Sequence, residues 1–161
     1  MAPERSDVPQ EPSWFLKVTT YKNGKHEIKT TSEARLSELD LSKYDAVIDL
    51  VHRKAEIRPE NGKVIKYLGQ LPSMGPRRGL AALLAIMRRP GRFSLPYELA
   101  ALGKCDNLAV DNNLSAAILA IRRFLGETGK KPWFILTITP LAAAWSPDRS
   151  FCLVEREDRS S

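Results

Sequence analysis

Apolar and polar positions alternate in the first third of the chain, as they do in β-strands. Residues 14–30, WFLKVTTYKNGKHEIKT, alternate on both sides of Asn23 and Gly24, two residues that accept the positive φ angles of a type I′ turn. This pattern predicts a β-hairpin. Residues 55–68, AEIRPENGKVIKYL, indicate a second hairpin with its turn at PENG, and the run AVIDLV at 46–51 indicates a buried strand.

The segment 32–45, between the first hairpin and the buried strand, is ambiguous. Ser32 fits the cap of one helical turn, with Leu36 and Leu39 facing inward. The first part of the chain is therefore expected to be mostly β, with at most one short helix.

A helical period replaces the alternation after residue 72. Ser73 and Pro76 are helix start signals, and Pro90 with Gly91 gives the stop signal. Between them, apolar residues at i, i+3, i+4 and i+7 define one buried face: Leu80, Leu83, Leu84 and Met87.

Two more helices and two strands complete the pattern. Phe93 fits a short strand, Ser94 is the expected cap of the second helix, and Gly103 ends that helix. The third helix spans DNNLSAAILAIRRFLGE (111–127), and its inward stripe consists of Leu114, Ile118, Ile121 and Leu125. WFILTIT and SFCLVE (133–139 and 150–155) predict a terminal hairpin connected by PLAAAWSPDR. This order describes a helix-turn-helix variant with a β wing.

The composition indicates a globular protein with an excess of positive charge. Apolar residues make up 43% of the 161 residues, charged residues make up 27%, and the formal net charge is +6. Residues 1–70 carry 12 basic and 11 acidic side chains, whereas residues 71–161 carry 13 basic and 8 acidic ones. A basic second half suggests an anionic partner, with nucleic acid first, although an excess of this size also serves solubility.

Sequence signals for a metal site, a cofactor or an enzyme are missing. Cys105 and Cys152 form no CxxC motif, and His26 and His52 are isolated. We therefore expect ordinary thiols, no metal and no cofactor. GPRRG at 75–79 lacks the lysine of a phosphate-binding loop, and the chain has no nucleophile elbow, so we expect no enzymatic activity.

The N-terminal residues MAPERSDVPQEP lack the apolar segment of a secretory signal. The longest apolar runs are shorter than the ~18 residues that a membrane helix needs. Both absences predict a cytoplasmic protein with no membrane partner.

Residues 47–155 resemble the winged-helix effector domain of OmpR/PhoB-type response regulators. VIDLVHRKAEIRPENGKVIKYLGQL resembles the N-terminal β platform, and GPRRGLAALLAIMRRPGRFSLPYELAAL resembles the first two helices. VDNNLSAAILAIRRFLGE resembles the third helix, and WFILTI with SFCLVE resembles the wing. The resemblance implies an α+β winged helix-turn-helix fold with a β platform, three helices and a C-terminal β-hairpin wing.

The remaining residues then form a flexible tail (1–12), a β-rich N-terminal extension (13–46) and a second tail (156–161). HEIKTTSEARLSELDLSKYDAVIDL faintly resembles part of a receiver, with Asp49 near the phosphoacceptor position. No acidic pair precedes Asp49 to hold Mg²⁺, so we do not predict phosphorylation.

The resemblance implies a non-enzymatic transcription regulator that binds double-stranded DNA, with the third helix in the major groove. Asn112, Asn113, Ser115 and Leu119 would contact bases, and the last turns would contact phosphate through Arg122 and Arg123. Additional backbone or minor-groove contacts are expected from Arg77, Arg78, Lys130, Lys131 and Arg149. DNA binding would make the protein nucleoid-associated. Family members usually carry more cations on this helix than the two found here.

Protein partners are expected as well. A homodimer is expected, and the N-terminal extension would carry dimerisation or a regulatory contact. The loop 103–109 with Lys104 and Asn107 would contact RNA polymerase, as in related activators, unless it is a plain surface connection. The alternative function is an adaptor that binds protein and no specific DNA. In that case Ala116 and Leu119 form an apolar patch, and the apolar wing tip contributes Leu141 and Trp145.

Overall fold

The computed structural model of the protein describes residues 15–71, 79–110, 112–138 and 142–157. Its elements are β2 (Phe15–Lys22), β3 (Lys25–Ser32), α1 (Glu33–Leu36), the 3₁₀ helix η1 (Leu41–Lys43), β4 (Ala46–Asp49), β5 (Lys54–Ile57), β6 (Val64–Tyr67), the 3₁₀ helix η2 (Leu68–Gln70), α2 (Gly79–Met87), α3 (Pro96–Leu102), the 3₁₀ helix η3 (Asp106–Ala109), α4 (Asn113–Leu125), β7 (Ile135–Ile138), β8 (Ala142–Trp145) and β9 (Phe151–Arg156). The fold belongs to the α+β class.

A six-stranded sheet forms the middle layer, with the strand order β3-β2-β9-β4-β5-β6. All neighbours are antiparallel except β4 and β9, which run parallel. The hairpin β2–β3 turns at Asn23 and Gly24, whose φ angles are 54° and 79°, as the sequence predicts for a type I′ turn. The second predicted hairpin is β5–β6, and the predicted buried strand is β4.

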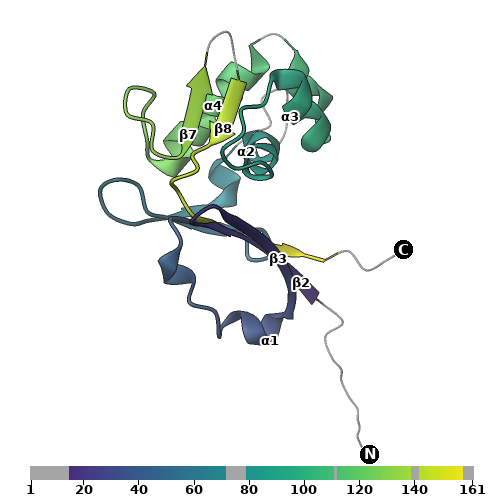
Figure 1. The fold of residues 1–161 in the computed structure, drawn as a ribbon, viewed down its shortest axis with the longest axis vertical. Helices are drawn as coiled ribbons and strands as arrows, with labels where there is room; N and C mark the ends of the chain where they lie inside the picture. The colour runs from purple at the N-terminus through teal and green to yellow at the C-terminus, as the bar shows by residue number, and fades with distance from the viewer. Residues whose placement is uncertain (1–14, 72–78, 111, 139–141, 158–161) are drawn as a thin grey trace, which may run out of the picture.

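The two faces of the sheet have different covers (Figure 1). Helices α2, α3 and α4 lie over one face, where a continuous apolar core joins them to alternate residues of the sheet such as Ile48, Ile57 and Phe151. The segment containing α1 and η1 lies over the other face, where a second apolar cluster includes Val18 and Cys152. Because side chains of a strand alternate between faces, β9 contributes to both clusters.

The short helix predicted at Ser32 is present as α1. The Ser32 hydroxyl accepts a hydrogen bond from the Arg35 amide at 3.3 Å, as an N-cap does. Leu36 is buried, as expected. The expectation for Leu39 was wrong, since its side chain is 43% exposed; the helix ends at Leu36, so the helical spacing no longer applies to Leu39.

The helical layer also contains a small hairpin. Strands β7 and β8 pair with each other, and Ser94, between α2 and α3, exchanges both backbone hydrogen bonds with Ala143 of β8. The predicted short strand at Phe93 is therefore a single bridge at Ser94. Ser94 is not the cap of α3: Leu95 is, and the Leu95 amide donates to the Glu98 carboxylate at 2.8 Å. The start signals Ser73 and Pro76 lie outside the described residues.

The predicted pairing of 133–139 with 150–155 is wrong. The partner of β7 is β8, which lies within the segment expected to connect the two strands, and β9 lies in the centre of the large sheet between β2 and β4. The reason is visible in the sequence FCLV, which is apolar at consecutive positions. Such a strand needs cover on both faces, which a central strand has and a wing strand lacks.

Candidate nucleic-acid interface

Helix α4 has one buried face and one exposed face. The predicted inward stripe is confirmed, because Leu114, Ile118, Ile121 and Leu125 are all buried. The exposed face carries three side chains expected to contact DNA: Ser115, Leu119 and Arg123. Leu119 is 52% exposed, and Ala116 and Ala120 are half-buried.

Arg122 is the main departure from the expected site. It is 7% exposed and lies inside the protein, whereas its neighbour Arg123 is exposed. The Nη1 of Arg122 is 2.6 Å from Oε2 of Glu127, and its Nη2 donates to the Thr137 hydroxyl at 3.4 Å. The prediction that Arg122 binds phosphate is therefore wrong, because its guanidinium is already paired with a buried carboxylate.

Glu127 joins the end of α4 to the start of β7. Its side chain is 1% exposed, and its carboxylate accepts hydrogen bonds from the amides of Phe134 at 2.6 Å and Ile135 at 3.3 Å. Burial raises the pKa of the Glu127 carboxyl, while these amides and Arg122 act in the opposite direction. Sequence reasoning missed Glu127 and Thr137; the signal was a glutamate directly after Gly126, the residue that ends α4 with a φ of 80°.

The start of α4 is tied to the preceding loop. Asn112 is exposed with a φ of 61°, and the Asn113 side-chain amide donates to the Asn107 carbonyl at 2.7 Å. Asn113 is therefore partly engaged, whereas the Asn112 side chain makes no cap bond to the helix. Lys104 and Asn107 are exposed, in a loop that is anchored by the buried residue Leu108.

The other expected cations lie in different surroundings. Lys130 and Lys131 are exposed in the loop between α4 and β7. Arg149 is half-buried: its guanidinium carbon is 3.3 Å from the centre of the Trp133 ring, and its Nε donates to the Trp133 carbonyl at 3.3 Å. The expectation of a minor-groove contact by Arg149 was wrong, because the residue follows β8 and packs on its own protein. Arg77 and Arg78 lie outside the described residues.

Trp145 does not lie at an exposed wing tip, so its expected role in a protein interface was wrong. Its side chain is fully buried, with ring centres 5.3 Å from Phe134 and 5.4 Å from Phe151. Its indole N–H donates to the Arg149 carbonyl at 2.7 Å. The run Ala142–Trp145 is apolar because it forms the inner strand β8. Leu141 lies outside the described residues.

Ile138 is an exposed apolar residue that sequence reasoning did not single out. It lies on β7 and is 52% exposed, while Ile135 of the same strand is buried. Helix α4 and strand β7 therefore each carry one exposed branched apolar side chain, Leu119 and Ile138. A strand with one buried face leaves such a residue on the outer side.

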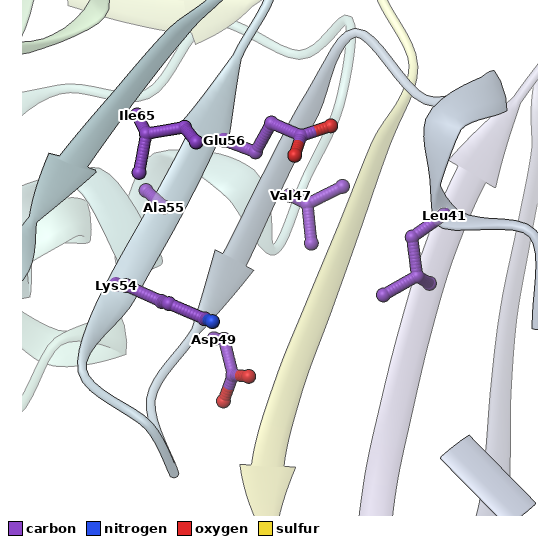
Figure 2. Close-up of a pocket in the computed structure, with 7 residues that line it drawn as sticks. All are labelled: Leu41, Val47, Asp49, Lys54, Ala55, Glu56 and Ile65. Carbon is purple, nitrogen blue, oxygen red and sulfur yellow. The ribbon is translucent and has the colours of Figure 1, made fainter. Parts of the chain in front are cut away.

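A hollow lies on the face of the large sheet opposite α4, and its lining residues include no catalytic pair (Figure 2). It is lined by Leu41, Val47, Asp49, Lys54, Ala55, Glu56 and Ile65. Asp49 accepts from the amides of Val51 and His52 at 2.9 Å and lies 2.8 Å from the His52 ring nitrogen. Glu56 pairs with Arg58. Both carboxylates are thus occupied by their own loop or strand.

Two further features of the described ranges bear on function. Within them, no group of three or more His, Cys, Asp or Glu side chains is arranged to hold a metal ion. Among their helices, none has the length and apolar character to cross a membrane.

No protein-family model, no curated protein and no solved structure matches the chain.

Proposed function

We propose that this protein binds double-stranded DNA through the exposed face of α4 and acts as a non-enzymatic transcription regulator of the OmpR/PhoB effector type. One observation carries the proposal. Helix α4 is anchored along its whole buried face and still presents Asn112, Ser115 and Arg123 to solvent. A rigidly held helix with small polar and cationic side chains on its outer face suits insertion into a major groove.

The arrangement around α4 supports a winged-helix interpretation. The order α2, bridge at Ser94, α3, α4 and hairpin β7–β8 has the three helices and the following hairpin of that fold. In this proposal β7–β8 is the wing. Strand β9 is an addition that returns the chain to the platform sheet.

The roles of individual residues follow from their exposure. In this proposal the exposed side chains of Asn112 and Ser115 contact base edges, and Leu119 contacts a thymine methyl group. Arg123, Lys130 and Lys131 supply the charge for phosphate contacts. Because Arg122 is buried and Arg149 is half-buried against Trp133, we expect fewer phosphate contacts than the sequence suggests. A homodimer and a contact of Lys104 and Asn107 with RNA polymerase remain part of the proposal.

The salt dependence of DNA binding tests this assignment. We expect a labelled random duplex to bind the wild-type protein with an affinity that falls as salt rises. The triple variant Arg123→Ala, Lys130→Ala, Lys131→Ala should bind more weakly. The slope of log K against log salt should flatten by about 1 for each phosphate-binding cation that is removed. Fluorescence anisotropy at several salt concentrations measures both quantities.

A matched control removes cations from the other side of the sheet. Arg35 in α1 and Lys43 in η1 are exposed, and both elements lie on the face opposite α4 (Figure 1). Lys29 is exposed and lines a pocket together with Lys43. A variant with Lys29→Ala, Arg35→Ala and Lys43→Ala loses the same charge and should keep the wild-type slope. Equal losses of affinity in both triple variants would reject a site at α4.

A protein-binding adaptor is the second candidate, and the exposed side chains of Leu119 and Ile138 favour it. Each is 52% exposed, and apolar residues of this size are typical anchors of protein interfaces. Trp145 no longer contributes, because its side chain is fully buried. If this candidate holds, Leu119→Ser with Ile138→Ser abolishes self-association in sedimentation, and Arg123→Ala leaves it unchanged.

A further inference from the structure

A cleft lies on the sheet face opposite α4, between the hairpin β2–β3 and the segment of α1 and η1. Its volume is about 270 Å³. The lining residues come from strands, from η1 and from the loop before it: Val18, Thr20, Glu27, Lys29, Thr30, Thr31, Leu39, Asp40, Leu41, Lys43, Tyr44 and Cys152. It shares Leu41 with the hollow of Figure 2 and lies on the other side of that residue.

The inner part of the cleft is apolar. Val18 and Cys152 are buried and form its floor, and Leu41 packs against the same apolar cluster. Leu39 is 43% exposed although it lines the cleft. An apolar ligand would therefore bury surface that the protein leaves exposed to water.

Two ammonium groups lie over the ring of Tyr44, a residue that lines the cleft. The Nζ atoms of Lys43 and Lys22 lie 5.5 Å and 5.7 Å from the centre of the Tyr44 ring, and Lys22 also donates to the Lys43 carbonyl at 2.9 Å. Lys29 lines the same cleft.

The carboxylates in the cleft have other partners. Glu27 is 3.2 Å from the Lys25 ammonium. Asp40 accepts from the Ser42 amide at 3.1 Å and from its hydroxyl. Among the residues that the structure describes, no carboxylate lies within ion-pair distance of Lys22 or Lys43. Neither ammonium group is therefore neutralised by a carboxylate of the described residues.

We propose that this cleft binds a small apolar carboxylate. The carboxylate binds at Tyr44, where the ammonium groups of Lys43 and Lys22 attract it, and Thr20 and Thr31 also line the cleft. The apolar body covers Val18, Leu39 and Leu41. A cleft of this volume is at the small end of ligand sites, so a chain of about eight carbons or a single ring system suits it. The site does not depend on DNA binding.

Octanoate and 1-octanol are suitable probes, because they share a chain length and differ in charge. In ¹H–¹⁵N correlation spectra, octanoate should cause saturable shifts at Val18, Thr20, Thr31 and Leu41. The double variant Lys22→Gln, Lys43→Gln should raise the dissociation constant of octanoate about fivefold or more. It should leave the dissociation constant of 1-octanol unchanged. Leu39→Ala should weaken both probes.

The matched control is Lys54→Gln with Lys66→Gln, which removes two lysines from strands β5 and β6 and should leave both probes unaffected. All substituted lysines are at the surface or half-exposed, so we expect each variant to stay folded. The ¹H–¹⁵N spectrum of each variant without ligand verifies this. Shifts confined to Ala55 and Ile65, no saturable shift at millimolar octanoate, or an equal loss of affinity in both double variants would overturn the proposal.

Discussion

Arg122 and Arg123 are adjacent in α4 and lie in opposite environments. Successive helical residues are separated by about 100° around the axis, so one of the pair turns inward and the other outward. Arg122 pairs with the buried Glu127 carboxylate, and Arg123 is exposed. The helical period already places Arg122 four residues after Ile118 and three before Leu125, at the edge of the buried stripe. That signal was overlooked, and the partners that hold Arg122 inside, Glu127 and Thr137, follow the end of the helix.

The two arginines should therefore differ in their effect on stability. We expect Arg122→Ala to lower the free energy of unfolding by about 3–5 kcal/mol, because it leaves the buried Glu127 carboxylate without its cation. Arg123→Ala should change it by less than about 0.5 kcal/mol. Urea denaturation of both variants measures the difference. Equal effects would contradict the placement of Arg122.

Cys152 provides a second test at the residue scale. Burial raises the pKa of its thiol to about 12, and the Asp49 carboxylate acts in the same direction. In a Cys105→Ala background at pH 8, the folded protein should react with Ellman's reagent roughly a thousandfold more slowly than the unfolded chain, since only the thiolate attacks. Rapid reaction of the folded protein would place Cys152 outside the core.

The same thiol makes stability depend on pH. Its folded pKa is raised, so its contribution is fully present below the ordinary value of 9.0 and is lost as the pH rises toward 12. The difference in unfolding free energy between wild type and Cys152→Ala should shrink over that range.

At the scale of elements, local signals were sufficient for some predictions and insufficient for others. The Asn23-Gly24 turn, the cap at Ser32 and the stripe of α4 each depend on neighbouring residues, and each was predicted. The position of β9 depends on β2 and β4, which are distant in sequence. A terminal hairpin was expected because adjacent strands usually pair, and the consecutive apolar residues of FCLV were the overlooked signal.

Hydrogen exchange tests the central position of β9. Its backbone is paired on both sides, and Phe151, Cys152 and Val154 are fully buried. We expect the amides of Phe151–Val154 to exchange as slowly as the most protected amides of α4, because both open only in global unfolding. The edge strand β3 should exchange faster. Fast exchange throughout β9 would indicate a solvent-exposed wing strand instead.

At the scale of the whole molecule, the sheet separates two surfaces with different chemistry. Helix α4 lies on one side of the sheet, and the segment of α1 and η1 lies on the other (Figure 1). The cleft that Lys29 and Lys43 line is on the side of η1. The first and last strands of the large sheet are neighbours, since β2 pairs with β9. The Tyr21 hydroxyl of β2 also donates to the Pro147 carbonyl, shortly before β9, at 3.0 Å. Sequence reasoning predicted the candidate helix and its exposed face apart from Arg122. It did not identify the cleft, because the lining residues meet only after the sheet forms.

Photo-cross-linking from position 115 tests the DNA-binding proposal most directly. With a photoreactive phenylalanine analogue in place of Ser115, irradiation with duplex DNA should give a covalent protein–DNA adduct. The same analogue in place of Arg35 should give none. The proposal predicts an adduct from position 115 alone that decreases as salt rises. A cross-link from position 115 to a second copy of the chain with no DNA adduct, or equal adducts from both positions, would contradict it.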